Sequence, residues 1–329
     1  MSKVSINLVT WNGERFIEDC LDSVFKQTFI DYSIIIIDNG SSDKTVEIIS
    51  NKYPHLKIVR HNQNFGYAKA HNQAIHWTKS DYVLCLNQDV ILESSFLSEM
   101  VMFMDQNNLC GSATGKLYRL QEGQKTKYFD SLGLRLHKNY KVTEIRAGEM
   151  DDGKSDISEQ IFGISGALSF YRRKALEDVV YKQEYFDENF FSYKEDVDMA
   201  HRLLLAGWKS FYVPRATACH ARTASAPTEE LTNREIIKNR KRKSQFVSSF
   251  SYRNHLYFIY KNLPQFKVKY LWPIFIYELL KFIYVLFCET KNLKAWSELF
   301  KNRKVMKQKR EVTMKNVKIK FEDYYKWLN

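Results

Sequence analysis

The sequence predicts an α/β protein with a mostly parallel sheet covered by helices on both faces. Strand-like and helix-like segments alternate four times in the first 105 residues. Alternation of this kind produces parallel strands joined by crossover helices. The strand-like segments are short continuous apolar runs, which is typical of strands buried on both faces. Polar residues follow several of these runs, where ligands bind in open α/β sheets.

Changes in hydrophobic periodicity delimit the first strands and the helices between them. We expect strands over residues 4–10, 32–37, 56–60 and 82–86, and helices over residues 14–27, 43–49 and 67–77. Apolar residues recur at helical spacing in the first helix, and Ser42 or Asp43 is placed to cap the second. These elements lead to the polar residues that follow the fourth strand.

Asn87, Gln88 and Asp89 end the fourth strand abruptly, and the candidate site is organised around them. A carboxylate at a strand end can hold a divalent cation, and the cation can neutralise a diphosphate. The structural alternative is that Asp89 only caps a helix that follows, because Asp is favoured at helix N-termini.

Thr10, Asn12, Asp38 and Asp43 follow the first and second strands. Acidic residues that follow different strands of one sheet lie close together at one edge of that sheet. If these residues only capped helices, there would be no reason for them to converge. The first turn lacks a GxGxxG sequence, so a dinucleotide-binding fold is not indicated. The sequence therefore predicts a nucleotide-binding edge of another kind.

Residues 111–159 are less regular, with strand-like pieces, and lead to a run with small residues at 162–171. Gly166 and Ala167 in this run let another molecule approach the backbone closely, although tight helix packing on the sheet would use glycine equally well. Beyond it, His220 and Arg222 point the same way on an extended segment, which suits one metal ligand and one phosphate contact.

A helix is expected to begin near Glu195 and to end at Gly207 and Trp208. Acids such as Glu195 and Asp196 are favourable in a first turn for structural reasons alone. The residues before them are heavily aromatic, however, and a carboxylate sheltered from water can act as a general base. Asp198 would point elsewhere on the helix.

The basic character of the chain belongs to its C-terminal third. Residues 1–231 carry 27 Lys and Arg against 31 Asp and Glu, whereas residues 232–329 carry 23 against 7, a net charge of +16. This asymmetry predicts a boundary near residue 231, and such a segment suits an anionic membrane or nucleic acid. The five cysteines, without CxxC spacing, indicate a reduced intracellular chain, and no signal peptide is recognisable.

Residues 271–287 form an apolar run in the basic region, interrupted by Pro273, Glu278 and Lys281. A spanning helix needs about 20 apolar residues with few charges, so this run is short for one. We expect helices that lie on the membrane surface, with the basic clusters 238–243 and 301–310 against anionic lipid. The main alternative is a helical subdomain packed on the rest of the chain or on another subunit.

Seven short motifs together resemble one known family. They are Thr10-Trp11-Asn12, Asp38-Asn39-Gly40-Ser41-Ser42-Asp43, Asn64-Phe65-Gly66, Asn87-Gln88-Asp89, Gly166-Ala167, Glu195-Asp196-Val197-Asp198 and His220-Ala221-Arg222-Thr223. In this order they resemble family 2 glycosyltransferases of the GT-A nucleotide-diphospho-sugar transferase fold. The resemblance covers residues 3–225 and implies a GT-A catalytic domain over 1–231 and a basic, mostly helical region over 232–329.

The resemblance also implies roles for the candidate residues. It assigns donor and nucleotide binding to the strand-end residues Thr10, Asn12, Asp38, Asp43, Asn64, Gly66, Asn87, Gln88 and Asp89, with Arg222. Asp89 and His220 would hold Mg²⁺ or Mn²⁺, and Asp196 would be the catalytic base, with Glu195 as the alternative. Gly166, Ala167 and Trp208 are expected to contact the acceptor. Asn87 departs from the Asp of the plain motif and leaves one fewer charge for a cation.

Within the family the chain is most similar to bacterial rhamnosyltransferase-like members, which build O-antigen and other cell-surface polysaccharides. This similarity implies an inverting transferase that uses dTDP-rhamnose, or alternatively a UDP-hexose, and a lipid-linked glycan acceptor. It also implies a cytoplasmic protein that is peripheral on the inner face of the plasma membrane, with homo-oligomerisation left open.

Three other functions are compatible with parts of the sequence. A nucleic-acid-binding protein would use the basic tail but leaves the acidic strand ends unexplained, so no nucleic-acid partner is expected. A non-catalytic sugar- or nucleotide-binding module would bind a donor without turnover. A nucleotidyltransferase would favour a basic first turn, and residues 10–15 offer only Arg15.

Overall fold

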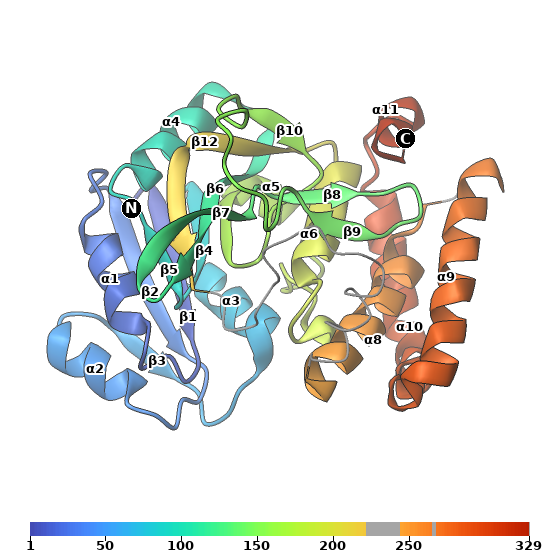
Figure 1. Cartoon of the computed structure of the whole chain (residues 1–329), viewed down its shortest axis with the longest axis horizontal. Coiled ribbons are helices and arrows are strands. Elements are labelled where there is room, and N and C mark those ends of the chain that lie inside the picture. Colours follow the sequence, from blue (N-terminus) through green and yellow to red (C-terminus); the bar gives the residue numbers. More distant parts are fainter. Residues whose placement is uncertain (222–243, 265–267, 329) are drawn as a thin grey trace.

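The computed structural model describes residues 1–221, 244–264 and 268–328. A sheet with flanking helices is formed by residues 1–221, and a group of helices formed by the later residues packs beside it (Figure 1). The predicted boundary at residue 231, the basic cluster 238–243 and Arg222 lie outside the described residues.

The central sheet is mixed and mostly parallel, as the sequence predicts. Its parallel half consists of β3 (Ile58–Arg60), β2 (Tyr32–Asp38), β1 (Val4–Thr10) and β4 (Tyr82–Asn87), side by side in that order. Next to β4, the antiparallel strand β11 (Leu168–Arg172) joins the two halves of the sheet. The second half contains the two longest strands, β6 (Cys110–Gln121) and β12 (Lys209–His220), which run parallel to each other.

Shorter strands extend the second half of the sheet. β5 and β10 pair with β12, β7 pairs with β6, and β8 and β9 form a separate two-stranded sheet. Their bounds are β5 (Val90–Leu92), β7 (Gln124–Ser131), β8 (Leu134–Leu136), β9 (Val142–Glu144) and β10 (Glu159–Ile161). The alternative in which Asp89 caps a helix is therefore wrong, because β5 follows Asp89 directly and the next helix begins only at Phe96.

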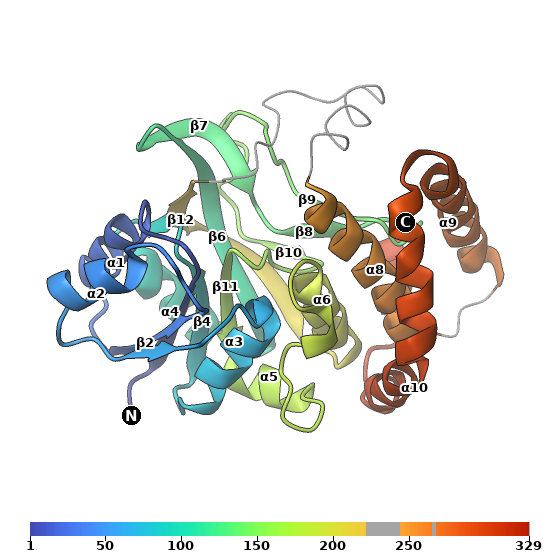
Figure 2. The same ribbon diagram turned by 90° about the horizontal axis from the view of Figure 1, so that it is seen from below.

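Helices cover both faces of the sheet, which explains why its strands are continuous apolar runs. On β4, Leu84 and Leu86 belong to one core cluster, whereas Val83 and Cys85 belong to the cluster on the opposite face. One face is covered by α1 (Ile17–Phe25), α2 (Thr45–Lys52) and α4 (Phe96–Gln106). The other face is covered by α3 (Gly66–His76), α5 (Arg173–Asp178) and α6 (Glu195–Leu205) (Figure 2).

The C-terminal helices form a third packed unit against α6 and the β8–β9 hairpin. Buried residues of all these elements share one core cluster, which includes Leu136, Leu204, Tyr257 and Met306. The helices are α8 (Gln245–Asn262), α9 (Val268–Cys288), α10 (Lys294–Lys315) and α11 (Phe321–Tyr325), with 3₁₀ turns at Thr290–Leu293 and Lys326–Leu328. In Figure 2, α8 and α10 lie between α6 and α9, and α9 is outermost.

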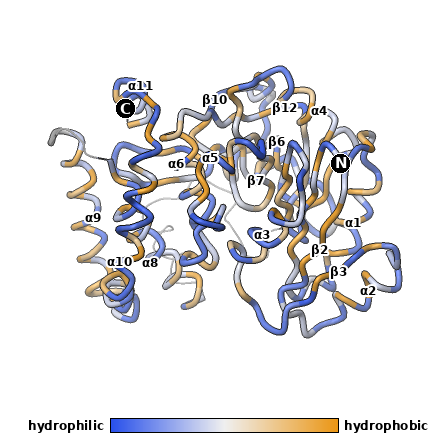
Figure 3. The backbone as a smooth tube through the Cα atoms, turned by 180° about the vertical axis from the view of Figure 1, so that it is seen from behind, coloured by the Kyte–Doolittle hydropathy of each residue, from blue (hydrophilic) through white to orange (hydrophobic). Residues whose placement is uncertain are grey.

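Helix α9 is longer than the apolar run predicted from the sequence. Its segment Tyr270–Cys288 is long and apolar enough to cross a membrane by length and composition, and only 11% of that stretch is buried. Figure 3 shows this helix as a largely apolar tube at the outer edge of the molecule. The expectation that this segment is too short for a spanning helix is therefore wrong, since length and composition alone allow either a spanning or a surface position.

Candidate active site

Gln88 fastens the ends of the two central strands to each other. Its Oε1 accepts hydrogen bonds from Thr10 Oγ1 and from the backbone N–H of Trp11 at 2.8 Å, and its Nε2 donates to Trp11 O at 3.1 Å. Thr10 is buried at the end of β1. Both predicted residues thus stand at the carboxyl edge of the sheet, where they shape the backbone of the first turn.

The first two loops are tied together by Asn12. This residue has a positive φ of 48°, its Oδ1 accepts from Ser42 N at 2.9 Å, and its own N–H donates to Ser41 Oγ at 2.9 Å. The Asp38 carboxylate, buried at the end of β2, lies 3.3 Å from the N–H of Ser41 through both oxygens. The structure therefore places Asn12 and Asp38 side by side in the adjacent loops that follow β1 and β2.

Asp43 lies at the start of α2 and accepts backbone hydrogen bonds from Glu14 N and Thr45 N, each at 3.0 Å. Burial alone would raise the pKa of Asp43, but hydrogen bonds from Thr45 and from the Glu14 backbone outweigh it and lower the pKa. The carboxylate is therefore ionised and engaged with the backbone around α2.

Gly66 brings the third loop against the segment that precedes α6. Asn64 Oδ1 accepts from Gly66 N at 2.8 Å and from Asn39 Nδ2 at 3.0 Å, which shapes the turn before α3. Gly66 has φ +85°, and a Cβ atom at this position would lie 2.4 Å from the carbonyl oxygen of Phe191. Only glycine fits both the conformation and the close contact.

Substituting Gly66→Ala is expected to destabilise the protein by about 3 kcal/mol, because the variant combines a left-handed conformation with a backbone clash. Urea unfolding measures the change. Gly123→Ala is the matched control, since Gly123 has φ +77° with nothing within 4 Å of its added Cβ. We expect about 1 kcal/mol there, and equal losses in the two variants would contradict the proposed contact with Phe191.

Asp89 and His220 lie side by side where β4 ends. His220 Nε2 is 3.3 Å from Asp89 Oδ1, and His220 Nδ1 is 2.8 Å from Asp130 Oδ2. Pairing of β12 with β5 and β6, and of β6 with β7, brings His220 and Asp130 together. Burial alone would lower the pKa of His220, but hydrogen bonds to Asp130 and Asp89 raise it to about 9.

The side chains of Asp89 and His220 can contribute two ligands to a cation. Asp89 offers a carboxylate that is 15% exposed, and His220 offers Nε2 once this nitrogen is deprotonated, while Asp130 fixes the ring through Nδ1. Among the described residues, no group of three or more His, Cys, Asp or Glu side chains is arranged to hold a metal. Asp89 and His220 therefore fit a cation only if other ligands, such as diphosphate oxygens, complete its shell.

Asp196 and Glu195 begin α6, as the sequence predicts for this helix, but their environments differ. Asp196 accepts two backbone hydrogen bonds, from Gly166 N at 2.9 Å and from Val197 N at 2.7 Å. Glu195 is 5% exposed, and its Oε2 has no hydrogen-bond partner among the described residues.

Burial raises the pKa of both carboxyl groups, and that of Glu195 is raised well above its ordinary value. The two N–H donors favour the ionised form of Asp196. We therefore take Glu195 as the protonated carboxyl group and Asp196 as the ionised one.

The segment Gly166–Ala167 connects the two halves of the candidate site. Ala167 O accepts from the backbone N–H of Asn87 at 3.1 Å, and Gly166 N donates to Asp196. Gly166 O also accepts from the Tyr67 hydroxyl at 2.8 Å. Asp196 and the polar end of β4 thus border the same short segment.

Not every predicted residue reaches this place. Trp208 follows the C-terminal end of α6, and its Nε1 donates to Asp178 Oδ2 at 3.2 Å. Asp196 lies at the opposite end of this 11-residue helix, which is about 16 Å long. Asp130 and Tyr67 are contacts that the sequence did not suggest, because each lies in an ordinary strand or helix without a motif.

These features define a nucleotide-sugar transferase fold of the GT-A type. The structure is similar to the crystal structure of GalNAc-T7 with UDP, GalNAc and Mn²⁺, with a TM-score of 0.58 at 13% identity, over 79% of this chain and 48% of that one. Residues 5–180 match glycosyl transferase family 2. The chain belongs to this family.

Curated relatives support the same family. The chain is 28% identical over 221 residues to a poly-beta-1,6-N-acetyl-D-glucosamine synthase of Staphylococcus epidermidis, covering 65% of this chain and 48% of that protein. It is 27% identical over 241 residues to the N-acetylglucosaminyl-diphospho-decaprenol L-rhamnosyltransferase of Mycobacterium tuberculosis, covering 66% and 75%. The chain thus spans about half the length of the first of these relatives.

Proposed function

We propose that this protein is an inverting glycosyltransferase that moves rhamnose from dTDP-rhamnose to a hydroxyl of a growing, lipid-linked cell-surface polysaccharide. The observation that carries the proposal is the hydrogen-bonded connection from Asn87, at the end of β4, through Gly166–Ala167 to Asp196. In the proposed arrangement the carboxylate base and the diphosphate position lie on either side of this segment. A UDP-hexose donor is the alternative, since both relatives named above act in glycan synthesis by their names but differ in sugar.

The base is Asp196, which takes the proton of the acceptor hydroxyl as that oxygen attacks the anomeric carbon. Its ionised form is favoured by the N–H groups of Gly166 and Val197, so it is ready to accept a proton. Glu195 remains protonated beside it and adds no second charge. One base and one direct displacement give inversion at the anomeric carbon.

Asp89 and His220 would hold a divalent cation, Mg²⁺ or Mn²⁺, which would neutralise the donor diphosphate; the crystal structure of GalNAc-T7, which has the same fold, contains UDP, GalNAc and Mn²⁺. When bound, the cation neutralises the charge that develops on the leaving diphosphate. Asp130 keeps the Nε2 of His220 directed at Asp89. Thr10, Asn12, Asp38 and Asp43 shape the loops that receive the nucleotide.

A thermal-shift panel of dTDP-rhamnose and UDP-hexoses, each with and without Mg²⁺ or Mn²⁺, tests the donor assignment. A ligand stabilises the folded state by RT ln(1 + [L]/Kd), so the true donor gives the largest shift. We expect dTDP-rhamnose with a cation to rank first and to release dTDP on incubation. Stabilisation without any release of nucleotide would favour a non-catalytic binding protein instead.

We also propose that α9 rests on the cytoplasmic membrane surface. The charges that interrupt its apolar run turn toward the protein: Glu278 Oε1 lies 2.6 Å from His255 Nε2, and the Lys281 ammonium lies over the Tyr252 ring. Over residues 272–287 the outward face is then apolar and comprises Trp272, Phe275, Ile276, Leu279, Leu280, Ile283, Leu286 and Phe287. Exposed basic residues of α10, among them Lys301, Arg303 and Lys304, suit anionic headgroups.

The double substitution Leu280→Glu with Phe287→Glu is expected to reduce cosedimentation with phosphatidylglycerol vesicles at least about 10-fold, because two charges enter the apolar face. The matched control is Ile30→Glu with Leu109→Glu, which changes two exposed apolar residues, 86% and 60% exposed, outside the C-terminal helices. Equal binding of both variants would contradict membrane contact through α9. A change of oligomeric state on gel filtration in the first variant alone would assign this face to another subunit.

A further inference from the structure

The segment that leads into α6 has an unusual backbone. Phe191, Tyr193 and Lys194 have positive φ values of 64°, 71° and 68°, and none of them is glycine. Each such residue costs about 1–3 kcal/mol and persists only where surrounding contacts enforce it. Because Glu195 and Asp196 follow directly, this segment sets the direction in which both carboxyl groups leave the helix.

The contacts that enforce this backbone come from α8. Asn254 is fully buried, and its Nδ2 donates to the carbonyl oxygens of Phe190 at 2.9 Å, Ser192 at 2.9 Å and Tyr193 at 2.6 Å. Its neighbour Arg253 donates from Nη2 to the carbonyl oxygens of Asn189 and Phe190, each at 3.0 Å. Two adjacent side chains of one helix therefore hold the carbonyl oxygens of Asn189, Phe190, Ser192 and Tyr193.

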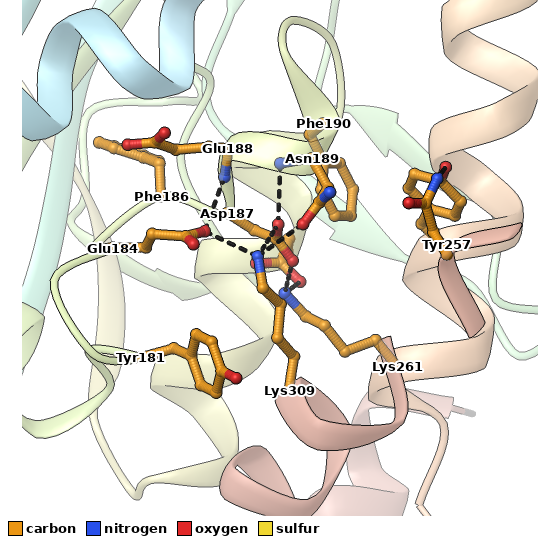
Figure 4. A network of polar contacts seen from close by, with 12 residues as sticks. Tyr181, Glu184, Phe186, Asp187, Glu188, Asn189, Phe190, Tyr257, Lys261 and Lys309 are labelled. Carbon is orange, nitrogen blue, oxygen red and sulfur yellow. Dashed lines mark hydrogen bonds and ion pairs between the residues drawn. The ribbon is translucent and has the colours of Figure 1, made fainter. Parts of the chain in front are cut away.

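A buried ion cluster fixes the two flanks of the same segment. Lys261 of α8 lies 2.7 Å from Asp187 Oδ2 and 2.6 Å from Asp198 Oδ1. Lys309 of α10 lies 2.6 Å from Asp187 Oδ1, and Figure 4 shows both ammonium groups meeting at this carboxylate. Asp187 precedes the strained turn and Asp198 stands in the first turn of α6. All four side chains are at most 3% exposed.

We propose that Arg253 and Asn254 are positioning residues, which hold residues 190–194 in the conformation that aims Asp196 at Gly166. The C-terminal helices then complete the catalytic unit, in addition to any contact with a membrane. The inference rests on the proposed function in one respect, the role of Asp196 as the base. Apolar packing alone would not need a buried amide whose donor group is shared among three backbone carbonyls.

Arg253→Met tests the proposal in the full chain, with Arg215→Met at an exposed position of β12 as the matched control. We expect kcat for nucleotide release from dTDP-rhamnose, or from the UDP-sugar selected by the panel, to fall at least about 10-fold. The Kd of dTDP or UDP should change less than about 2-fold, because the nucleotide loops are untouched. Arg253→Lys, which keeps one cationic donor, is expected to restore part of kcat.

Hydrogen exchange of the same variants gives a readout that does not depend on turnover. Amides of residues 190–198 should exchange at least about 10-fold faster in Arg253→Met and in Asn254→Asp, while those of β1 and β2 stay unchanged. Unchanged kcat in folded Arg253→Met, or unchanged exchange at 190–198, would overturn the proposal. If Asn254→Asp does not fold, Arg253→Met decides. If the wild-type protein turns over no nucleotide sugar, the proposed function fails, and hydrogen exchange still decides whether α8 holds this turn.

Discussion

Asp196→Asn is expected to lower kcat at least about 100-fold while leaving the affinity for the donor nucleotide unchanged. The amide keeps the shape of the side chain but cannot accept the acceptor's proton. Glu195→Gln is the informative comparison, because an amide resembles the protonated carboxyl group that we assign to Glu195. We expect a much smaller loss there, and Asp323→Asn on exposed α11 should behave as wild type.

The pH dependence of kcat follows from the same assignment. Burial raises the pKa of Asp196 above its ordinary value, and the base works only when ionised. Activity should therefore fall as pH decreases through a pKa above 3.8, and this acid limb should disappear from the residual activity of Asp196→Asn. Near-normal turnover in Asp196→Asn together with inactive Glu195→Gln would assign the base to Glu195.

Asp89→Asn is expected to weaken cation-dependent binding of dTDP or UDP at least about 100-fold. The substitution keeps the size of the side chain but removes the only carboxylate of the Asn87-Gln88-Asp89 motif, so a bound cation loses its charged protein ligand. Binding is measured by titration calorimetry with and without Mn²⁺.

Asp19→Asn, a substitution of an exposed carboxylate on α1, is the control for this experiment. Wild-type affinity in Asp89→Asn, with an undiminished response to Mn²⁺, would contradict the role of Asp89. Loss of binding in the absence of a cation as well would indicate that Asp89 shapes the nucleotide loop instead.

The central strands β1 and β4 of the parallel half could be predicted because they are buried on both faces. Leu84 and Leu86 face one layer of helices and Val83 and Cys85 the other, so the whole run is apolar and easily recognised. The direction of β11 could not be predicted, because a five-residue apolar run carries no sign of its orientation. Its antiparallel course is set by its neighbours β4 and β6.

Some residues of the candidate site could be predicted from the sequence, and others could not. The start of α6 at Glu195 follows from a run of acids after aromatic residues, and the structure has the helix begin there. Asp130 carries no such signal: it reaches His220 only through the pairing of β7, β6 and β12. The contact of Asn254 with the turn before α6 depends on helix packing over long sequence separations, which periodicity does not encode.

The stereochemistry of the first-formed product tests the central claim most directly. The claim is that a carboxylate and a diphosphate face each other across one gap, so that the acceptor oxygen displaces the leaving group in a single step. Time-resolved NMR of the sugar transferred or released from the selected donor should show an anomeric configuration opposite to that of the donor. Retention of the donor's configuration would require a covalent intermediate or a different attacking geometry and would contradict the account.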